Sequence, residues 1–135
     1  MGWLLSVTIL LYTLGLLQSI LGFYQKRQTF VNIALILVAV GFACHTLFLI
    51  SLSLERGHFP ITNLPEALCF FAWCISLSFM IAYIRYRITA LGAFILPLSS
   101  VLAMVSQVIW EENHSIPAAL KSGWVYFHSG VAFLA

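Results

Sequence analysis

Long apolar runs separated by short polar segments dominate the chain. They cover about residues 3–23, 32–54, 66–84, 89–109 and 123–135. A membrane-spanning helix needs about 20 predominantly apolar residues, and the first four runs have that length. Because every backbone N–H and C=O in lipid needs an internal partner, each run predicts a helix, and no strand-like alternation competes. The pattern therefore predicts an all-α, polytopic transmembrane helix bundle with four complete spans.

The fifth run stops too early to cross a bilayer. Trp124 to Ala135 is 12 residues, which gives a helix of roughly 18 Å. The hydrocarbon core is about 30 Å thick. We therefore expect a truncated fifth span within a single integral membrane domain, residues 1–135, and interpret the chain as a fragment of a longer protein. The alternative is a last helix that ends inside the membrane.

Composition agrees with the bilayer as solvent and excludes several other classes. Apolar residues make up 62% of the 135 residues and charged residues 7%, whereas soluble domains are roughly half apolar and a quarter charged. The net charge of +2 contains no basic run that would indicate nucleic acid. Three cysteines without a CxxC spacing predict neither a disulfide framework nor a zinc site. No nucleophile–base pair or phosphate loop is recognisable, so no catalytic residue is predicted.

Charges in the loops predict the orientation. Lys26 and Arg27 lie in the first loop, and Arg85 and Arg87 lie in the third. The second and fourth loops mix cations with carboxylates. Cytoplasmic loops carry the excess of Lys and Arg. We therefore expect the first and third loops in the cytoplasm, with the N-terminus and the other two loops on the extracytoplasmic side.

The second loop carries an unusual polar stretch, GHFPITNLPEALCFFAW, residues 57–73. Asn63 is a good helix N-cap, Pro65 falls in the first turn, and Glu66 occupies the capping-box position. One reading is a rigid, capped hairpin and nothing more. The other makes the hairpin one wall of an outer-face site, with an aromatic group below it: Phe70, Phe71 and Trp73.

Two histidines fall inside apolar runs. His45 is near the expected midplane of the second span, where an ionisable group by default marks a functional site. Its alternative role is a neutral imidazole hydrogen-bonded to a neighbouring helix. His128 lies four residues after Trp124, on the same helix face and close to the outer boundary. His58 and His114 are interpreted as solvated loop residues.

The two intramembrane histidines favour a cofactor over a proton relay, because the spans offer them no carboxylate partner. Haem takes an axial imidazole and an apolar, aromatic pocket. Their expected depths differ by roughly 7 Å, whereas two ligands of one iron are about 4 Å apart. We therefore expect two sites, with His45 at a buried one and His128 near the surface.

Three segments resemble a known family. Residues 57–73 resemble the G-x-F-P-x-x-N-x-x-E-x-x-x-F-x-x-W stretch of the CcsA/ResC haem-handling proteins of cytochrome c assembly. VGFACHTLFL resembles the His-bearing second span of the related HemX-like branch. LKSGWVYFHSGVAFLA resembles the family's W-x-x-x-H segment. Together they cover about half the chain, in the family's order. The family's WGxxWxWD segment is absent from this sequence.

The resemblance implies that the protein binds haem b non-covalently and presents it at the extracytoplasmic face for attachment to apocytochrome c. It implies His128 and His45 as axial ligands of the haem iron, with Trp124 and Trp73 also in contact with haem. It further implies a ResB-type membrane partner and the bacterial inner membrane. Such a chain is a component of a cytochrome c synthase complex rather than a stand-alone enzyme.

Two other functions stay open. A HemX-like membrane regulator of haem synthesis would act through a partner and leave cytochrome c intact. A transporter of another solute would show paired helix breaks and an internal repeat. Pro97 interrupts the fourth run, but no matching break or repeat is visible.

Overall fold

The computed structural model describes residues 2–88, 90–110, 128 and 131–132, and these residues contain four long helices and no strand. The helices are α1 (Gly2–Gln25), α2 (Gln28–Arg56), α3 (Leu64–Tyr86) and α4 (Ala90–Val108). All four are long and apolar enough to cross a membrane. The expectation of an all-α bundle with four spans is confirmed. Most of the expected fifth span lies outside the described residues. Three of its residues are described, and all three are helical and exposed: His128, Val131 and Ala132.

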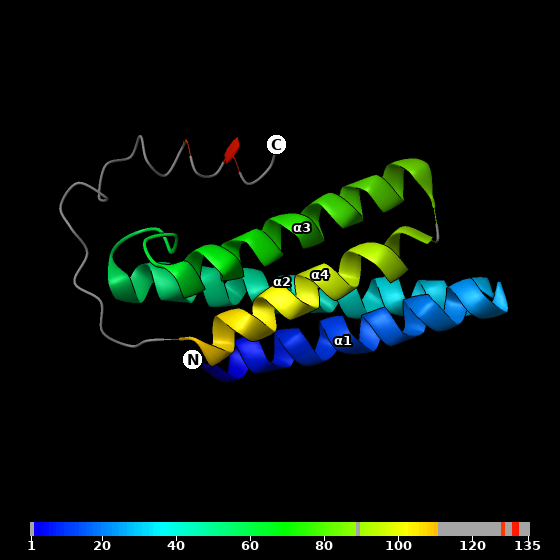
Figure 1. Ribbon diagram of the computed structural model, residues 1–135, viewed down its shortest axis with the longest axis horizontal. Coiled ribbons are helices and arrows are strands. Elements are labelled where there is room, and N and C mark those ends of the chain that lie inside the picture. Colours follow the sequence, from blue (N-terminus) through cyan, green and yellow to red (C-terminus); the bar gives the residue numbers. More distant parts are fainter. Residues whose placement is uncertain (1, 89, 111–127, 129–130, 133–135) are drawn as a thin grey trace.

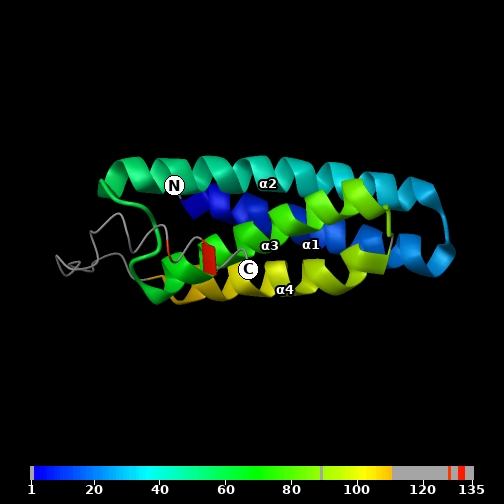
Figure 2. The same cartoon turned by 90° about the horizontal axis from the view of Figure 1, so that it is seen from above.

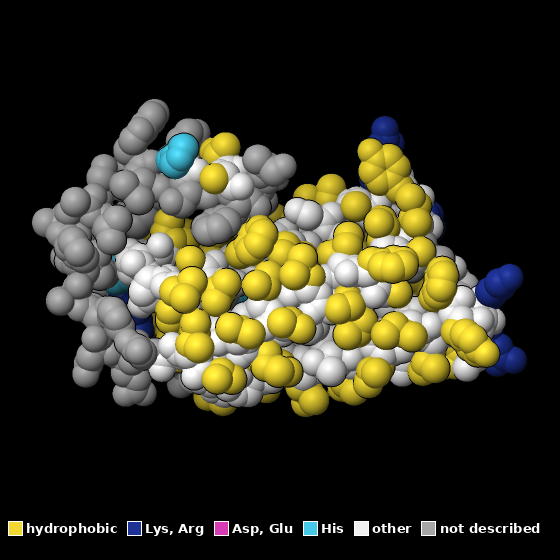
Figure 3. Space-filling view, viewed as in Figure 1, with side chains coloured by type: hydrophobic (Ala, Val, Ile, Leu, Met, Phe, Trp, Pro, Cys, Tyr) yellow, Lys and Arg dark blue, Asp and Glu magenta, His cyan; other side chains and the backbone are white. Residues whose placement is uncertain are grey.

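The four helices run up and down beside one another (Figures 1 and 2). Helix α1 packs against α2 and α4, and α3 packs mainly against α4, with a narrower contact to α2. The α1–α2 and α3–α4 connections lie at one end of the bundle. We name this the cationic end for its four residues Lys26, Arg27, Arg85 and Arg87, and basic side chains stand out there in Figure 3. The α2–α3 loop lies at the opposite end, the Glu66 end.

Glycines bring α1 and α2 close together. A β-carbon on Gly15 would lie 2.8 Å from the Cγ2 of Val38, and one on Gly41 would lie 2.9 Å from the ring of Tyr12. Real β-carbons do not approach neighbours so closely, so larger residues would push the helices apart. Small residues at helix contacts are the usual means by which membrane helices gain van der Waals packing, since lipid provides no hydrophobic drive between them.

Serines join α3 to α4. The Ser76 and Ser99 hydroxyl oxygens are 2.6 Å apart, and Ser99 also donates to the carbonyl of Ala72 at 3.1 Å. All of these groups are buried. Pro97 lies inside α4, which runs unbroken from Ala90 to Val108 in the structure. The proline therefore does not divide the fourth helix in two.

Candidate functional site

The loop between α2 and α3 is fixed at both ends by helix caps. Helix α2 is capped by Gly57, whose φ of 67° lies in the left-handed region, and the Gly57 N–H donates to the Ser53 carbonyl at 3.0 Å. Helix α3 begins after Asn63, whose side-chain oxygen accepts a hydrogen bond from the Glu66 N–H at 2.9 Å. Pro65 occupies the first turn of α3. The expected N-cap at Asn63 is confirmed, and the segment is a rigid connection.

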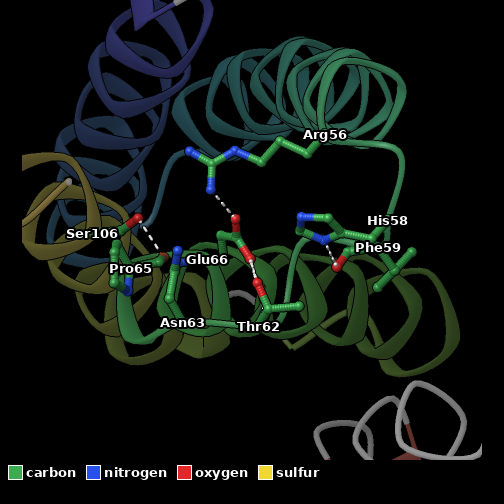
Figure 4. Close-up of polar contacts among 8 residues, drawn as sticks. All are labelled: Arg56, His58, Phe59, Thr62, Asn63, Pro65, Glu66 and Ser106. Carbon is green, nitrogen blue, oxygen red and sulfur yellow. Dashed lines mark hydrogen bonds and ion pairs between the residues drawn. The ribbon is translucent and has the colours of Figure 1, made fainter. Parts of the chain in front are cut away.

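Glu66 is the centre of a buried polar network (Figure 4). Its side chain is fully buried, and its carboxylate forms an ion pair with the guanidinium of Arg56. The same carboxylate accepts hydrogen bonds from the Thr62 N–H at 2.9 Å and the Thr62 hydroxyl at 2.7 Å. A capping box would direct it to the Asn63 N–H instead. We call Arg56, Thr62, Asn63 and Glu66 the Glu66 network, and it ties the end of α2 to the start of α3.

Two further contacts connect this network to α4 and the segment after it. The Ser106 hydroxyl donates to the Pro65 carbonyl at 2.7 Å (Figure 4). The Arg56 guanidinium lies 5.4 Å from the ring centroid of Trp110, within the range of a cation–π interaction. Contacts from three helices therefore hold the loop at the Glu66 end.

Below the loop, four aromatic side chains form a continuous row between α2 and α3. The Phe59 and Phe70 rings meet edge to face with centroids 5.1 Å apart. Phe70 stacks on Trp73 at 5.8 Å, and Trp73 stacks on Phe42 at 5.2 Å. The Trp73 indole N–H donates to the Thr46 hydroxyl at 2.9 Å, which fixes the indole orientation. We call Phe59, Phe70, Trp73 and Phe42 the aromatic row.

His45 is fully buried in the middle of the bundle, 11 residues from the end of α2 and thus roughly 16 Å along the helix. Its Nδ1 lies 3.3 Å from the Tyr12 hydroxyl on α1, and its Nε2 lies 3.2 Å from the Cys69 thiol on α3. A neutral imidazole has one donor and one acceptor nitrogen, and hydroxyl and thiol groups serve in either role. Both nitrogens are thus occupied, as in the hydrogen-bonded alternative weighed for this residue.

A metal does not fit His45 in this conformation. Iron at Nε2 would replace the Cys69 contact, and a porphyrin there would overlap the fully buried Cys69 side chain. Among the described residues, no group of three or more His, Cys, Asp or Glu side chains is arranged to hold a metal ion.

The other predicted residues are distributed along the chain. Trp73 lies in the aromatic row, while His128 is helical and exposed. Trp124 and His114 lie outside the described residues. His58 is half-buried, with its Nδ1 at 3.0 Å from the Phe59 carbonyl.

Sequence reasoning missed the partners of these residues. Arg56 is one of the cations in the second loop, and the sequence predicts neither it nor Tyr12, Thr46 or Cys69 as a partner. One signal was present for Arg56, since a carboxylate and a cation ten residues apart flank a single short loop. Tyr12 and Cys69 lie 33 and 24 residues from His45, and no local pattern connects them.

Sequence comparisons place these features among known proteins. The chain is 29% identical to the cytochrome c biogenesis protein CcsA of Prochlorococcus marinus (strain MIT 9301) over 117 residues. The matched segment covers 83% of this chain and 37% of the relative. The protein of the same name from Synechococcus sp. (strain CC9605) is 30% identical, over 92% of this chain and 42% of the relative. CcsA of Chlorella vulgaris is 34% identical, over 63% of this chain and 28% of the relative.

The chain spans well under half the length of these curated relatives. No protein-family model matches it. No solved structure matches it. The similarity nevertheless runs through most of this chain in several CcsA proteins. The chain therefore belongs to the CcsA-like cytochrome c biogenesis family, of which it represents a partial, N-terminal region.

Proposed function

We propose that the protein acts in cytochrome c biogenesis by binding haem and presenting it at the extracytoplasmic face for attachment to apocytochrome c. The names of the relatives support the first part of this proposal, since they are cytochrome c biogenesis proteins. Haem is here the substrate that is carried, as non-covalently held haem b. Apocytochrome c is the acceptor that we propose, and a ResB-type membrane protein is the proposed partner.

The aromatic row is the observation that carries the proposal. The ring planes of Phe70 and Trp73 lie 14° from parallel and those of Trp73 and Phe42 lie 24° from parallel, so the three side chains form one aromatic stack. A porphyrin is flat and apolar over most of its area, and aromatic side chains favour offset stacking on such faces. The row begins at Phe59 in the loop and continues into the bundle at Trp73 and Phe42. Its first member, Phe59, is exposed at the Glu66 end, which we propose faces the exterior.

The Glu66 network gives the aromatic row a rigid frame. Phe59 and Phe70 lie on either side of the polar segment that Asn63 and Glu66 hold in place. Loss of the Glu66 contacts would release the loop that carries Phe59. We therefore assign Glu66 a positioning role, in which it acts on haem only through the loop.

His128 is the axial ligand that we propose for haem at this face, because its side chain is exposed and the family resemblance points to it. His45 as an iron ligand stays a prediction. That role would require the Cys69 or the Tyr12 contact to break, since each ring nitrogen of His45 has a partner. We therefore expect His128 to bind haem without rearrangement, whereas His45 would first have to lose a hydrogen bond.

Spectroscopy of the full-length protein tests the proposal. Haem-replete cells should yield detergent-purified protein with a Soret band, and Trp73→Leu should reduce that band and c-type cytochrome maturation together. The control is Phe94→Leu, because Phe94 is an aromatic residue on α4 that is 75% exposed and outside the row. It should leave both readouts unchanged. Gel filtration and helical circular dichroism establish that each variant is folded.

Two results would contradict the proposal. The first is a full-length protein that stays colourless under these conditions while its strain matures cytochromes c normally. The second is a Trp73→Leu variant that binds haem as well as the Phe94→Leu variant does. His128→Ala separates the two histidines, since it should remove outer-face haem while the His45 contacts remain.

A further inference from the structure

A groove separates α2 from α3 at the cationic end, where α3 leans away from the rest of the bundle (Figure 1). Its volume is about 300 Å³, near the lower limit of small-molecule sites, which span roughly 300–1,000 Å³. Polar side chains line the part nearest the helix ends: Gln28, Asn32, Tyr83 and Arg87. Apolar side chains, including Ala39 and Met80, line the part further into the bundle. The groove is thus polar at its mouth and apolar along its length.

Hydrogen bonds order the mouth of the groove. The Gln28 side-chain amide donates to the Asn32 side-chain oxygen at 3.1 Å and to the Tyr83 hydroxyl at 3.2 Å. The second bond joins α2 to α3 across the groove. Arg87 lines the same mouth, and it forms no ion pair among the described residues.

The charge around the groove has one sign. The cationic end holds Lys26, Arg27, Arg85 and Arg87, and the described part of the chain has no carboxylate there. The two described carboxylates, Glu55 and Glu66, lie at the last turn of α2 and the first turn of α3, at the Glu66 end. The only ion pair among the described residues, Arg56 with Glu66, is also at that end. A ligand in the groove therefore meets uncompensated positive charge.

We propose that this groove binds one phospholipid with an anionic headgroup. The phosphate lies at the mouth, near the Arg87 guanidinium and the Tyr83 hydroxyl, and an acyl chain runs along the apolar part. Basic pockets between transmembrane helices bind acidic lipid headgroups through the same chemistry. The Tyr83 hydroxyl, which accepts a hydrogen bond from Gln28, donates its own hydrogen to the phosphate, while the Arg87 cation selects the headgroup charge. This inference is independent of haem binding.

Native mass spectrometry of the full-length protein tests this site. The protein is released from nanodiscs that contain either phosphatidylglycerol or phosphatidylcholine. We expect one phosphatidylglycerol to stay bound and phosphatidylcholine to dissociate. Arg87→Gln should weaken retention roughly fivefold, the effect of one basic residue near an anionic lipid. Ala39→Phe, which fills the groove without changing charge, should abolish retention.

Arg85→Gln is the matched control, because Arg85 is exposed at the same end and does not line the groove. It removes the same charge and should leave retention unchanged. An equal loss in Arg85→Gln and Arg87→Gln would overturn the proposal in favour of diffuse surface charge. So would equal retention of the two lipids, or displacement of the lipid by haemin with the same dependence on Ala39→Phe. If either test variant is misfolded by circular dichroism, Tyr83→Phe serves in its place, with a partial loss expected.

Discussion

Replacing Glu66 by Gln tests whether the Glu66 network stabilises the fold. The substitution keeps the side-chain volume but exchanges one carboxylate oxygen for an NH₂ group. In the native protein, one oxygen faces the Arg56 guanidinium, and the other accepts two bonds from Thr62. The single oxygen of Gln can accept either from Arg56 or from Thr62. Its NH₂ group then faces the donors of the residue that is left. The substitution therefore weakens either the ion pair with Arg56 or the Thr62 bonds at the end of the loop.

The structure bounds the size of this effect. Removing one partner of a fully buried ion pair costs about 3–5 kcal/mol. The Arg56 side chain is 20% exposed, so water can partly solvate the unpaired guanidinium, and the cost is lower. One lost hydrogen bond to a charged group is worth about 1.5–3 kcal/mol. We therefore expect Glu66→Gln to lower the free energy of unfolding by about 2–3 kcal/mol.

The assay is unfolding of the full-length protein in mixed micelles with increasing dodecyl sulfate, followed by far-ultraviolet circular dichroism. Glu55→Gln is the matched control, because Glu55 is exposed on the last turn of the same end of α2. Its effect should stay within about 0.5 kcal/mol. Equal effects of the two substitutions would refute the reasoning. If the reasoning holds, a double-mutant cycle of Glu66→Gln with Arg56→Met should give a coupling energy of at least about 1 kcal/mol.

Three further predictions concern the bundle core and its orientation. Tyr12→Phe removes the hydroxyl beside His45 and should lower the unfolding free energy by about 0.6–1 kcal/mol; no change in the same micelle assay would count against that bond. Gly15→Ala places a β-carbon 2.8 Å from a valine methyl on α2 and should cost about 1–3 kcal/mol, whereas a stabilised variant would mean that the helices are less closely packed. Glu55→Cys should react with a membrane-impermeant maleimide in intact cells and Tyr86→Cys only after permeabilisation, and the reverse pattern would invert the proposed orientation.

The sequence predicted the number and position of the spans because the bilayer leaves few choices. A long apolar segment in lipid must form a helix, and the four helices contain or closely match the predicted ranges. The Asn63 cap was also predictable, since capping depends on residues that are neighbours in sequence. In contrast, the α2 and α3 helices extend several residues beyond the apolar runs, because polar residues continue a helix at its ends.

The interior contacts were not predictable in the same way. A membrane helix is apolar on its lipid-facing side as well as on its buried side, so hydrophobic periodicity does not identify the face that turns inward. For example, Phe94 is 75% exposed while Phe79 is buried. The pairing of His45 with Tyr12 and Cys69 depends on how three helices rotate against one another. The row from Phe59 to Phe42 depends on the same rotations.

The α1–α2 contact is more tightly packed than the α2–α3 contact, and this affects how the helices can separate. Parting α1 from α2 would open a contact in which glycines interlock with a valine and a tyrosine along much of the pair. Parting α3 from α2 would break side-chain contacts near Glu66, the Trp73–Thr46 bond and the Gln28–Tyr83 bond, with ring stacking in between. The second separation exposes less tightly fitted surface. We therefore expect the bundle to open first between α2 and α3, while α1 and α2 stay together.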